Sequence, residues 1–523
     1  MMLSPSLGHR LSALVLIASL SACANYSGIS SSQTMLNTKQ LATEQSLGAE
    51  HDINPVVYEW PTQTWWKNFN DPQLDALITE ALESNPSLAI AAAKLARANA
   101  SLEHFHAATL PNVGVTADAS RQHYTENGMY PAPLGGSTQT SGNVTLQAKY
   151  DLDFWGRNHA AAAASRSRLA VAQAESASAQ LMLASAVSKT YFQLAQLQRF
   201  RRIGDSALEQ RLHIYQLTKQ RVDAGLDTQV ELKQAETQLP LTRTNIEMVK
   251  ENIVNTQHAL AALLGAGPDR VLNLQAALPE PNASHNFALS PQNIPIALLG
   301  HRPDLVAARW QVEAAQQDTK ASKAAFYPNI NLVAFAGYSS IGLDQLLRSS
   351  SENYGAGPAL SLPIFDGGRL RANLKANYAD YDAAVANYNQ TLIGALRDVA
   401  DQLNSYRFLQ PQIAQQQLAL DAASAAYNLA MQRYNAGLGN YLTVLNAQSM
   451  VIQQQLFQSQ LRLRALTTHV ELARALGGGF PNIDPVRVAD DSAVTETETK
   501  IASATFAASQ INSNTPITTA APL

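Results

Sequence analysis

The sequence predicts a mainly helical fold in which long antiparallel helical hairpins are combined with four strands of a membrane β-barrel. Three observations predict it. Apolar and polar side chains alternate strictly over short stretches, residues 157–203 contain neither proline nor glycine, and the second half of the chain repeats motifs of the first. The first pattern is typical of strands, the second of long helices, and the third of a duplicated unit.

Composition excludes several classes of protein. The chain has 523 residues, of which 37 are Lys or Arg and 41 are Asp or Glu, so its formal net charge is −4. This near-balance argues against a nucleic-acid-binding protein, which needs a basic surface to replace phosphate counterions. A hydrophobic content of 46% favours a folded chain. The single cysteine excludes an intramolecular disulfide framework and any multi-cysteine zinc site.

The N-terminus predicts an export signal that ends in a lipidated cysteine. A short basic region closes at Arg10, and residues 11–20 form an apolar run that is too short to span a bilayer. The sequence Leu-Ser-Ala then precedes Cys23 and matches the bacterial lipobox. We expect residues 1–22 to be a signal peptide and the Cys23 thiol to carry a diacylglyceryl group; the alternative is an ordinary signal peptide with a chance cysteine. Ala24 stands where aspartate would favour inner-membrane retention, which favours the outer membrane.

Polar segments are expected at the ends of the chain and between its structural units. Residues 23–60 are rich in Ser, Thr, Gln and Asn and predict a poorly ordered, lipid-anchored tether. Residues 266–289 are expected to be a linker, and residues 478–523 a largely disordered tail. Three tryptophans near the end of the tether are interpreted as an anchor that packs on the body: Trp60, Trp65 and Trp66.

An internal duplication organises the mature chain. Arg221–Leu226 matches Arg433–Leu438, which lies 212 residues later. The same offset relates three further pairs: Val187 and Val399, Ala235 and Ala447, and Gly265 and Gly477. Two copies of one structural repeat are therefore expected, over about residues 72–265 and 290–477.

Each repeat is predicted to contain a helix, two strands and a helical hairpin, in that order. Asn85 followed by Pro86 suits the start of the first helix, and Pro303 the start of its counterpart. Both helices should end before a proline, at Pro111 and Pro328, because proline disfavours helical backbone in the preceding residue. The strands are expected at about 111–122, 142–154, 328–339 and 354–365, and the hairpins at about 157–264 and 367–476.

The strand pattern is clearest from Val144 to Phe154, where apolar and polar residues alternate without interruption. Strands of about 9–11 residues with this period suit a membrane β-barrel, with apolar side chains toward lipid and polar ones toward water. A half-buried hairpin of a soluble protein is the alternative that this pattern alone leaves open. The smallest known membrane barrels have about eight strands, so four strands per chain imply that several chains share one barrel.

The hairpins are predicted to consist of very long helices. A helix of about 65 residues is roughly 100 Å long. Gly225 and Gly437 lie between the two helices of each hairpin, where glycine commonly ends a helix. Apolar residues at spacings of three and four, such as Leu208, Leu212 and Tyr215, indicate coiled-coil packing. A cytosolic coiled coil is the alternative, but the export signal and the strands argue against it.

No catalytic motif accompanies these elements. The chain lacks nucleotide-binding, zinc-protease and serine-hydrolase motifs, so we expect neither enzyme activity nor a cofactor. His104 and His106 lack an evident third ligand nearby, so no metal site is expected. Asp151 and Asp153 share one face of a strand and are interpreted as part of a polar lumen wall instead of an acid–base pair.

Longer motifs carry a resemblance to a known family. They are spread over nearly the whole mature chain: Trp65-Trp66, Asp71-Pro72-Gln73-Leu74, Asp151-Leu152-Asp153-Phe154-Trp155-Gly156, Arg302-Pro303-Asp304-Leu305, Leu362-Pro363-Ile364-Phe365-Asp366-Gly367-Gly368-Arg369 and Tyr441-Leu442-Thr443-Val444-Leu445-Asn446. With these motifs the chain resembles the TolC-type outer membrane factor family, in the lipoprotein branch of its multidrug and organic-acid efflux channels.

The resemblance implies a homotrimer in the outer membrane of a Gram-negative bacterium. Three chains of four strands would share one twelve-stranded barrel, and their helical hairpins would form a hollow α-barrel in the periplasm. The implied partners are outer membrane lipid, a periplasmic adaptor protein and an inner-membrane pump. The chain itself would conduct drugs and other small organic compounds passively.

The resemblance also implies roles for residues at the ends of the hairpins. The adaptor would contact the hairpin tips, which consist of Ala224, Gly225, Leu226, Ala436, Gly437 and Leu438. Glu231 and Tyr434 match positions at which relatives hold the periplasmic end shut. Thr443 and Asn446 match positions at which relatives often carry aspartate rings that favour cations. Both residues are neutral, which leads to the hypothesis of a neutral constriction lined by Asn446.

Two other functions stay open at the level of the sequence. One is the outer membrane duct of a type I protein-secretion system, which would use the same fold. The other is a structural surface lipoprotein with a coiled-coil stalk, which would not conduct ions. The lipobox and the Trp-Trp segment resemble drug-efflux lipoproteins and favour the exit channel of a tripartite efflux system.

Replacing Cys23 should abolish lipidation, because the substitution Cys23→Ala removes the thiol to which the diacylglyceryl group is attached. Cells grown with radiolabelled palmitate are expected to label the wild-type protein and to leave the variant unlabelled. Label that persists in the Cys23→Ala protein would refute the assignment of the anchor.

Overall fold

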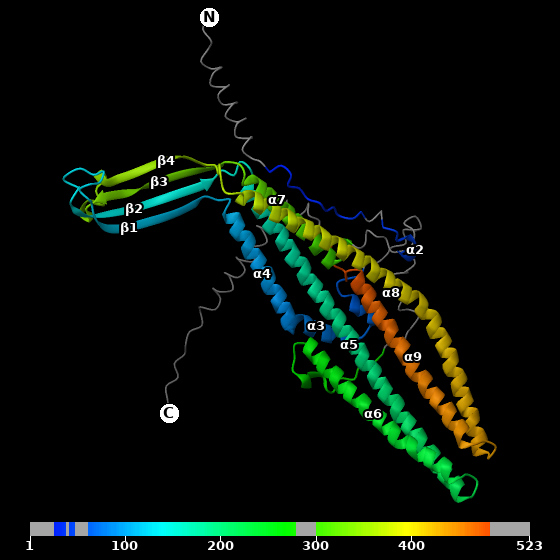
Figure 1. Cartoon of the computed structure of the whole chain (residues 1–523). Coiled ribbons are helices and arrows are strands. Elements are labelled where there is room, and N and C mark those ends of the chain that lie inside the picture. Colours follow the sequence, from blue (N-terminus) through cyan, green and yellow to red (C-terminus); the bar gives the residue numbers. More distant parts are fainter. Residues whose placement is uncertain (1–25, 38–40, 48–60, 279–299, 482–523) are drawn as a thin grey trace, which may run out of the picture. The chain divides into compact units, whose positions relative to one another are not determined.

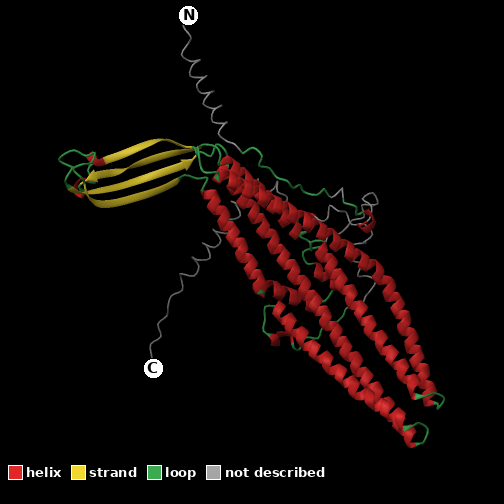
Figure 2. Cartoon of the chain, in the orientation of Figure 1, coloured by secondary structure: helices red, strands yellow, loops and turns green. Residues whose placement is uncertain are grey.

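A computed structural model gives the fold of the chain and describes residues 26–37, 41–47, 61–278 and 300–481. Residue contacts divide the chain after Phe480, and every element below belongs to the N-terminal unit. Figure 2 shows long helices and one group of strands in this unit. The predicted signal peptide and Cys23 lie outside the described residues, as does the tail from residue 482 onward.

The predicted fold class, long helices combined with four antiparallel strands, is confirmed. The helices are α2 (Glu44–Leu47), α3 (Pro72–Ser84), α4 (Pro86–Ala107), α5 (Arg157–Asp223), α6 (Gln229–Leu263), α7 (Pro303–Ala324), α8 (Arg369–Asn435) and α9 (Tyr441–Ala475). The strands are β1 (Asn112–His123), β2 (Thr138–Asp151), β3 (Asn329–Ile341) and β4 (Glu352–Ser361). In Figure 1, α5 with α6 and α8 with α9 form the two long hairpins.

The strands form one antiparallel sheet in the order β1-β2-β3-β4. Their register arranges the residues in rows across the sheet that alternate between apolar and polar. One row consists of Val115, Leu146, Ala336 and Tyr354, and the next of Thr116, Thr145, Gly337 and Asn353. The large side chains of the apolar row are exposed in the single chain. One face of the sheet is therefore suited to lipid.

Strands β2 and β4 end earlier than the sequence predicts. The predicted second strand runs to 154, but β2 ends at Asp151 because Asp153 adopts a left-handed backbone conformation with φ of 43°. The Asp153 carboxylate accepts hydrogen bonds from the backbone N–H groups of Asn158 (3.1 Å) and His159 (2.9 Å). These bonds satisfy free N–H groups in the first turn of α5. β4 likewise ends at Ser361 and not at 365.

The long helices pass through residues that usually end or bend helices. α5 continues through Gly204, α8 through Pro411 and α6 through Pro240. A proline inside a helix costs roughly 3 kcal/mol relative to alanine. Packing between neighbouring helices must offset this cost, since tertiary contacts supply most of the stability of helices in proteins.

The largest apolar core lies where α3, α5, α6 and α9 meet. Trp65 and Trp66 are buried in it, so the prediction that the tryptophans pack on the body is confirmed for these two. Trp60 lies outside the described residues. The Tyr191 hydroxyl donates a hydrogen bond to Asp71 Oδ2 at 2.7 Å, which fixes the start of α3 against α5.

The two halves of the chain use the same contacts to join their helices. The Asn85 side chain, at the N-cap of α4, donates to the backbone oxygen of Leu263 at 2.7 Å. Arg302, at the N-cap of α7, donates to the backbone oxygen of Ala475 at 3.3 Å. Leu263 and Ala475 are separated by the repeat offset of 212 residues and end α6 and α9, respectively. The duplicated sequence thus produces duplicated contacts.

The polar segment near the N-terminus is partly ordered, although the sequence predicts poor order throughout it. Residues 26–37 lie along α8, and Leu47 of α2 packs against Leu392 and Leu396 of that helix. Figure 1 shows the segment beside α8. Hydrogen bonds from α8, described below, explain why low hydrophobicity did not leave the segment loose.

None of the helices in the described part of the chain is both apolar and long enough to cross a bilayer.

Candidate functional site

The turns at the ends of the two hairpins have the same backbone structure. Gly225 and Gly437 both have φ of 74°, a left-handed conformation that favours glycine. The Leu226 N–H donates to the oxygen of Arg221 at 2.8 Å, and the Leu438 N–H donates to the oxygen of Arg433 at the same distance. These bonds close the ends of α5 and α8 in the manner of a Schellman motif.

Each turn also presents a leucine to solvent. Leu226 is 66% exposed and Leu438 is 71% exposed, and Ala224 and Ala436 beside them are exposed as well. An exposed leucine on a rigid turn loses little conformational entropy when a partner covers it. The predicted tip residues therefore have the geometry of a contact surface.

A buried tyrosine joins the two hairpins close to these turns. The Tyr434 side chain of α8 is fully buried, and its hydroxyl donates to Asp227 Oδ2 at 2.8 Å. The same hydroxyl lies 3.0 Å from the hydroxyl of Thr218 in α5. Burial and the hydrogen bond to Asp227 raise the pKa of Tyr434 to about 12, so the phenol remains a neutral donor.

Arg221 holds the acceptor of this hydrogen bond in place. Its Nε and Nη2 donate to the two carboxylate oxygens of Asp227 at 2.8 and 3.2 Å, a bidentate ion pair. Its Nη1 donates to the backbone oxygen of Tyr434 at 3.2 Å, and the guanidinium carbon lies 4.6 Å from the centre of the tyrosine ring. Arg221, Asp227, Tyr434 and Thr218 are called the tip network below.

Protonation of Asp227 would weaken the tip network. The hydrogen bonds from Arg221 lower the pKa of Asp227 in spite of its partial burial. A carboxyl group with a lowered pKa stabilises the fold above its ordinary pKa, and this contribution is lost as the pH falls through the lowered value. The tip network is therefore complete at neutral pH.

Glu231 has a different role from the one that the sequence suggested. Its Oε2 accepts hydrogen bonds from the backbone N–H of Thr228, at 2.9 Å, and from the Thr228 hydroxyl, which form the capping box of α6. The carboxylate that meets Tyr434 is Asp227 instead. The hypothesis of a Tyr434–Glu231 pair is thus replaced by a Tyr434–Asp227 pair, because Glu231 is used to cap its own helix.

Sequence reasoning missed Asp227, Arg221 and Thr218 as members of this site. A comparison of the two repeats carries the signal: Asp227 corresponds to Gly439, 212 residues later, and Tyr434 corresponds to Val222. The two halves of the pair occur once each, in different copies. Residues that break an internal repeat are candidates for contacts between its copies.

Thr443 and Asn446 lie three residues apart on an exposed face of α9. The Thr443 N–H and hydroxyl both donate to Asn440 Oδ1, at 3.0 and 2.7 Å, so Thr443 helps to cap α9. Residues 441–461 contain no charged side chain. This face of α9 is accordingly polar but uncharged.

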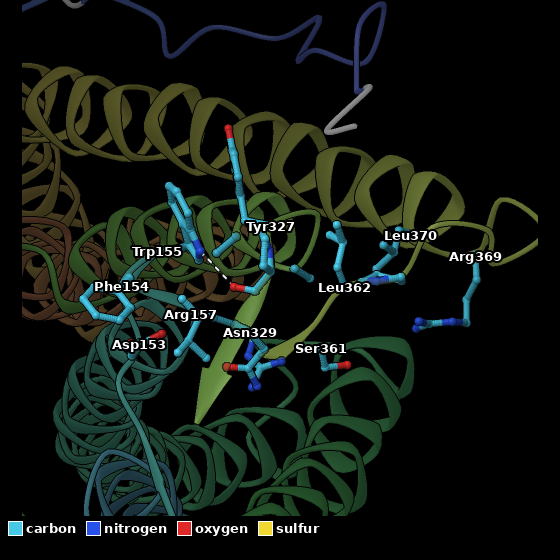
Figure 3. Close-up of a pocket in the computed structure, with 15 residues that line it drawn as sticks. Asp153, Phe154, Trp155, Arg157, Tyr327, Asn329, Ser361, Leu362, Arg369 and Leu370 are labelled. Atoms are coloured by element: carbon cyan, nitrogen blue, oxygen red, sulfur yellow. Dashed lines mark hydrogen bonds between the residues drawn. The ribbon is translucent and has the colours of Figure 1, made fainter. Parts of the chain in front are cut away.

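A separate cavity of about 360 Å³ lies where the strands meet the helices (Figure 3). Trp155 donates from Nε1 to the backbone oxygen of Pro328 at 2.9 Å and stacks on Tyr327 with ring centres 4.5 Å apart. Burial alone would raise the pKa of Asp153, but the N–H groups of α5 lower it overall. Asp151 accepts from Arg157 at 3.1 Å. Both aspartates thus brace the start of α5, in place of the lumen wall that the sequence suggested.

Within the described residues, no group of three or more His, Cys, Asp or Glu side chains is placed to hold a metal ion. His104 and His106 lie in the last turn of α4.

Comparisons with known proteins agree with this geometry. The model of the family described as "Outer membrane efflux protein" matches residues 77–266 and 294–478. The multidrug resistance outer membrane protein MdtP of Escherichia coli (strain K12) is 30% identical over 451 residues, which cover 84% of this chain and 91% of that protein. The pyoverdine export outer membrane protein OpmQ of Pseudomonas aeruginosa is 32% identical over 423 residues, which cover 80% and 87%.

Solved structures share the fold. The crystal structure of the outer membrane protein VceC from Vibrio cholerae is 36% identical and superposes with a TM-score of 0.76. The superposition covers 81% of this chain and 100% of VceC. The likeness therefore includes the strands and both hairpins.

Removing the Tyr434 hydroxyl should loosen the hairpin ends. Tyr434→Phe keeps the ring in its pocket and deletes one hydrogen bond to a carboxylate, at a cost of about 1–2 kcal/mol. Amide hydrogen exchange in residues 214–235 should then speed up at least fivefold. Tyr427→Phe is the matched control, since Tyr427 lies on the same helix outside the tip network. Equal exchange in the two variants would contradict the role of the hydroxyl.

Proposed function

Because this chain belongs to the outer membrane efflux protein family, and is thus an outer membrane channel of an efflux system, we propose that it is the passive exit duct of a tripartite pump. Its partners are a periplasmic adaptor and an inner-membrane pump, which selects the solutes and supplies the energy. The observation that carries the proposal is the pair of identical hairpin turns, each with an exposed leucine, in a chain that matches the family over both repeats.

The proposed assembly is a homotrimer. In the described sheet, β1 and β4 each have one neighbouring strand, so each leaves one edge unpaired. Unpaired backbone groups are too costly in a bilayer, which requires the edges of several chains to pair into a closed barrel. Three chains would supply twelve strands and six hairpins, so that β1 of one chain pairs with β4 of the next.

The proposed cargo is small organic molecules. The names of relatives refer to multidrug resistance, pyoverdine export and solvent efflux. These names favour efflux over the alternative of a type I protein-secretion duct. A structural surface lipoprotein is disfavoured by membership of a family of channels.

The periplasmic end is proposed to be held shut by the tip network. Tyr434 and Asp227 tie the two hairpins of one chain together, and Arg221 strengthens the tie. Glu231, at the start of α6, stays a predicted gate residue through its capping of that helix. Thr443 and Asn446 would line the narrow part of the duct, and Cys23 would carry the lipid that anchors the chain in the outer membrane.

Docking of the adaptor predicts that a charge at the tip abolishes export. Leu438→Asp places a carboxylate where an apolar contact is proposed, and burying it unpaired costs several kcal/mol. Cells that depend on the channel should lose drug resistance, although the variant reaches the outer membrane in normal amount. Leu347→Asp, at an equally exposed leucine between β3 and β4, should leave resistance unchanged. Full resistance with Leu438→Asp would argue against docking at this turn.

A neutral constriction predicts weak ion selectivity. In planar bilayers with a salt gradient, the wild-type channel should give a reversal potential close to zero, because residues 441–461 carry no charge. Asn446→Asp should introduce cation selectivity and block by trivalent cations, and Asn446→Gln is the neutral control. Strong cation selectivity of the wild type that disappears in Asn446→Ala would count against the hypothesis.

A further inference from the structure

A carboxylate on α8 clamps the N-terminal segment. Asp382 accepts from the hydroxyls of Ser31 (2.6 Å) and Ser32 (2.8 Å). It also accepts from the backbone N–H groups of Ser32 (3.2 Å) and Gln33 (3.4 Å). Consecutive N–H groups that converge on one anion form a specific cradle instead of a chance contact. The hydrogen bond from Ser31 is the main cause that lowers the pKa of Asp382, so the clamp is charged at neutral pH.

A second clamp lies two turns further along the same face of α8. Asn389 Oδ1 accepts from the Leu36 N–H at 2.8 Å, and Asn389 Nδ2 donates to the oxygen of Thr34 at 3.0 Å. The amide side chain thus pairs with the backbone in both directions, as a neighbouring strand would. Asp382 and Asn389 are seven residues apart, which places them on one stripe of a helix.

The start of the segment is attached where the helices meet the sheet. The Tyr26 ring packs edge-on against Phe326 with centres 5.7 Å apart, and its hydroxyl lies 3.4 Å from that of Tyr327. The Arg371 side chain donates to the oxygen of Ser27 at 3.2 Å. β3 begins at Asn329, two residues after Tyr327.

The far end of the segment is held by apolar packing. Leu36, Leu41 and Leu47 pack in the cluster that contains Leu392 and Leu396 of α8. We call residues 26–37 the strap. It is attached at three places along α8, at Arg371, Asp382 and Asn389, and then leads into this cluster.

The strap shortens the reach of the proposed lipid anchor. Cys23 precedes Tyr26 by three residues, and three extended residues span at most about 11 Å. A flexible tether of the length of residues 23–60 would instead let its end range over roughly 30 Å or more. Attachment of the strap therefore reduces the region in which an acyl group on Cys23 can enter the membrane.

We propose that the strap is a positioning device, in which Asp382 and Asn389 fix the lipid-bearing end of the chain beside the first residues of β3. The acyl chains then enter the leaflet next to the strands that must insert into it. This inference rests on the proposed lipidation of Cys23 and adds a site that locates it. The occupant of the site is the chain's own N-terminal segment.

Photocrosslinking from the acyl chain tests the proposal directly. Cells expressing the full chain are fed a palmitate analogue that carries a diazirine and an alkyne, and crosslinked peptides are mapped after irradiation. In the wild type, crosslinks within the protein should concentrate on residues 326–333 and 358–365. The double variant Asp382→Ala, Asn389→Ala should lower this share at least threefold while it takes up the same amount of label.

Asp380→Ala is the matched control, because it removes the same charge from the same helix and Asp380 makes no printed contact with the strap. The control should keep the wild-type pattern. Hydrogen exchange of residues 31–36 should accelerate in the double variant alone, which verifies that the strap is released from a folded chain.

The outcomes separate the two proposals. A labelled wild type whose crosslinks are spread evenly, or a double variant with the wild-type pattern and a released strap, would overturn the positioning role and leave the lipid anchor intact. A wild type that takes up no label would overturn the anchor and the positioning role together.

Discussion

The two unpaired edges of the four-stranded sheet are the constraint on which the rest of the proposed architecture depends. A sheet whose outer rows are apolar and exposed needs a lipid surface, and an edge in lipid needs another strand. β1 and β4 can meet that need only on other copies of the chain. The number of helices that surround the duct then follows from the number of chains that close the barrel.

The duplicated unit explains how one chain supplies matching parts to such a ring. Asn85 and Arg302 make the same contact with the ends of α6 and α9, and Gly225 and Gly437 make the same turn. A ring of similar units allows similar neighbours everywhere. The copies differ where they must recognise each other, as in the pair of Tyr434 from one copy and Asp227 from the other.

Much of this fold can be predicted from the sequence, because long apolar repeats, strict alternation and turn glycines are local signals. The order of elements, the two hairpins and the turns at Gly225 and Gly437 follow from them. The end of β2 does not, since Asp151 and Asp153 continue the alternation while their side chains bind α5. The partner of Tyr434 and the attachment of residues 26–37 depend on contacts between distant segments, which no local pattern encodes.

The protonation states in the tip network have a consequence for how the duct can be unlocked. Tyr434 has its pKa raised to about 12, and Asp227 has its pKa lowered, so neither changes its charge across the range of acidity that a periplasm experiences. Proton flow through a nearby pump thus leaves this lock untouched. Unlocking has to come from a competing molecular contact, which makes the resting duct tight against antibiotics whatever the external acidity.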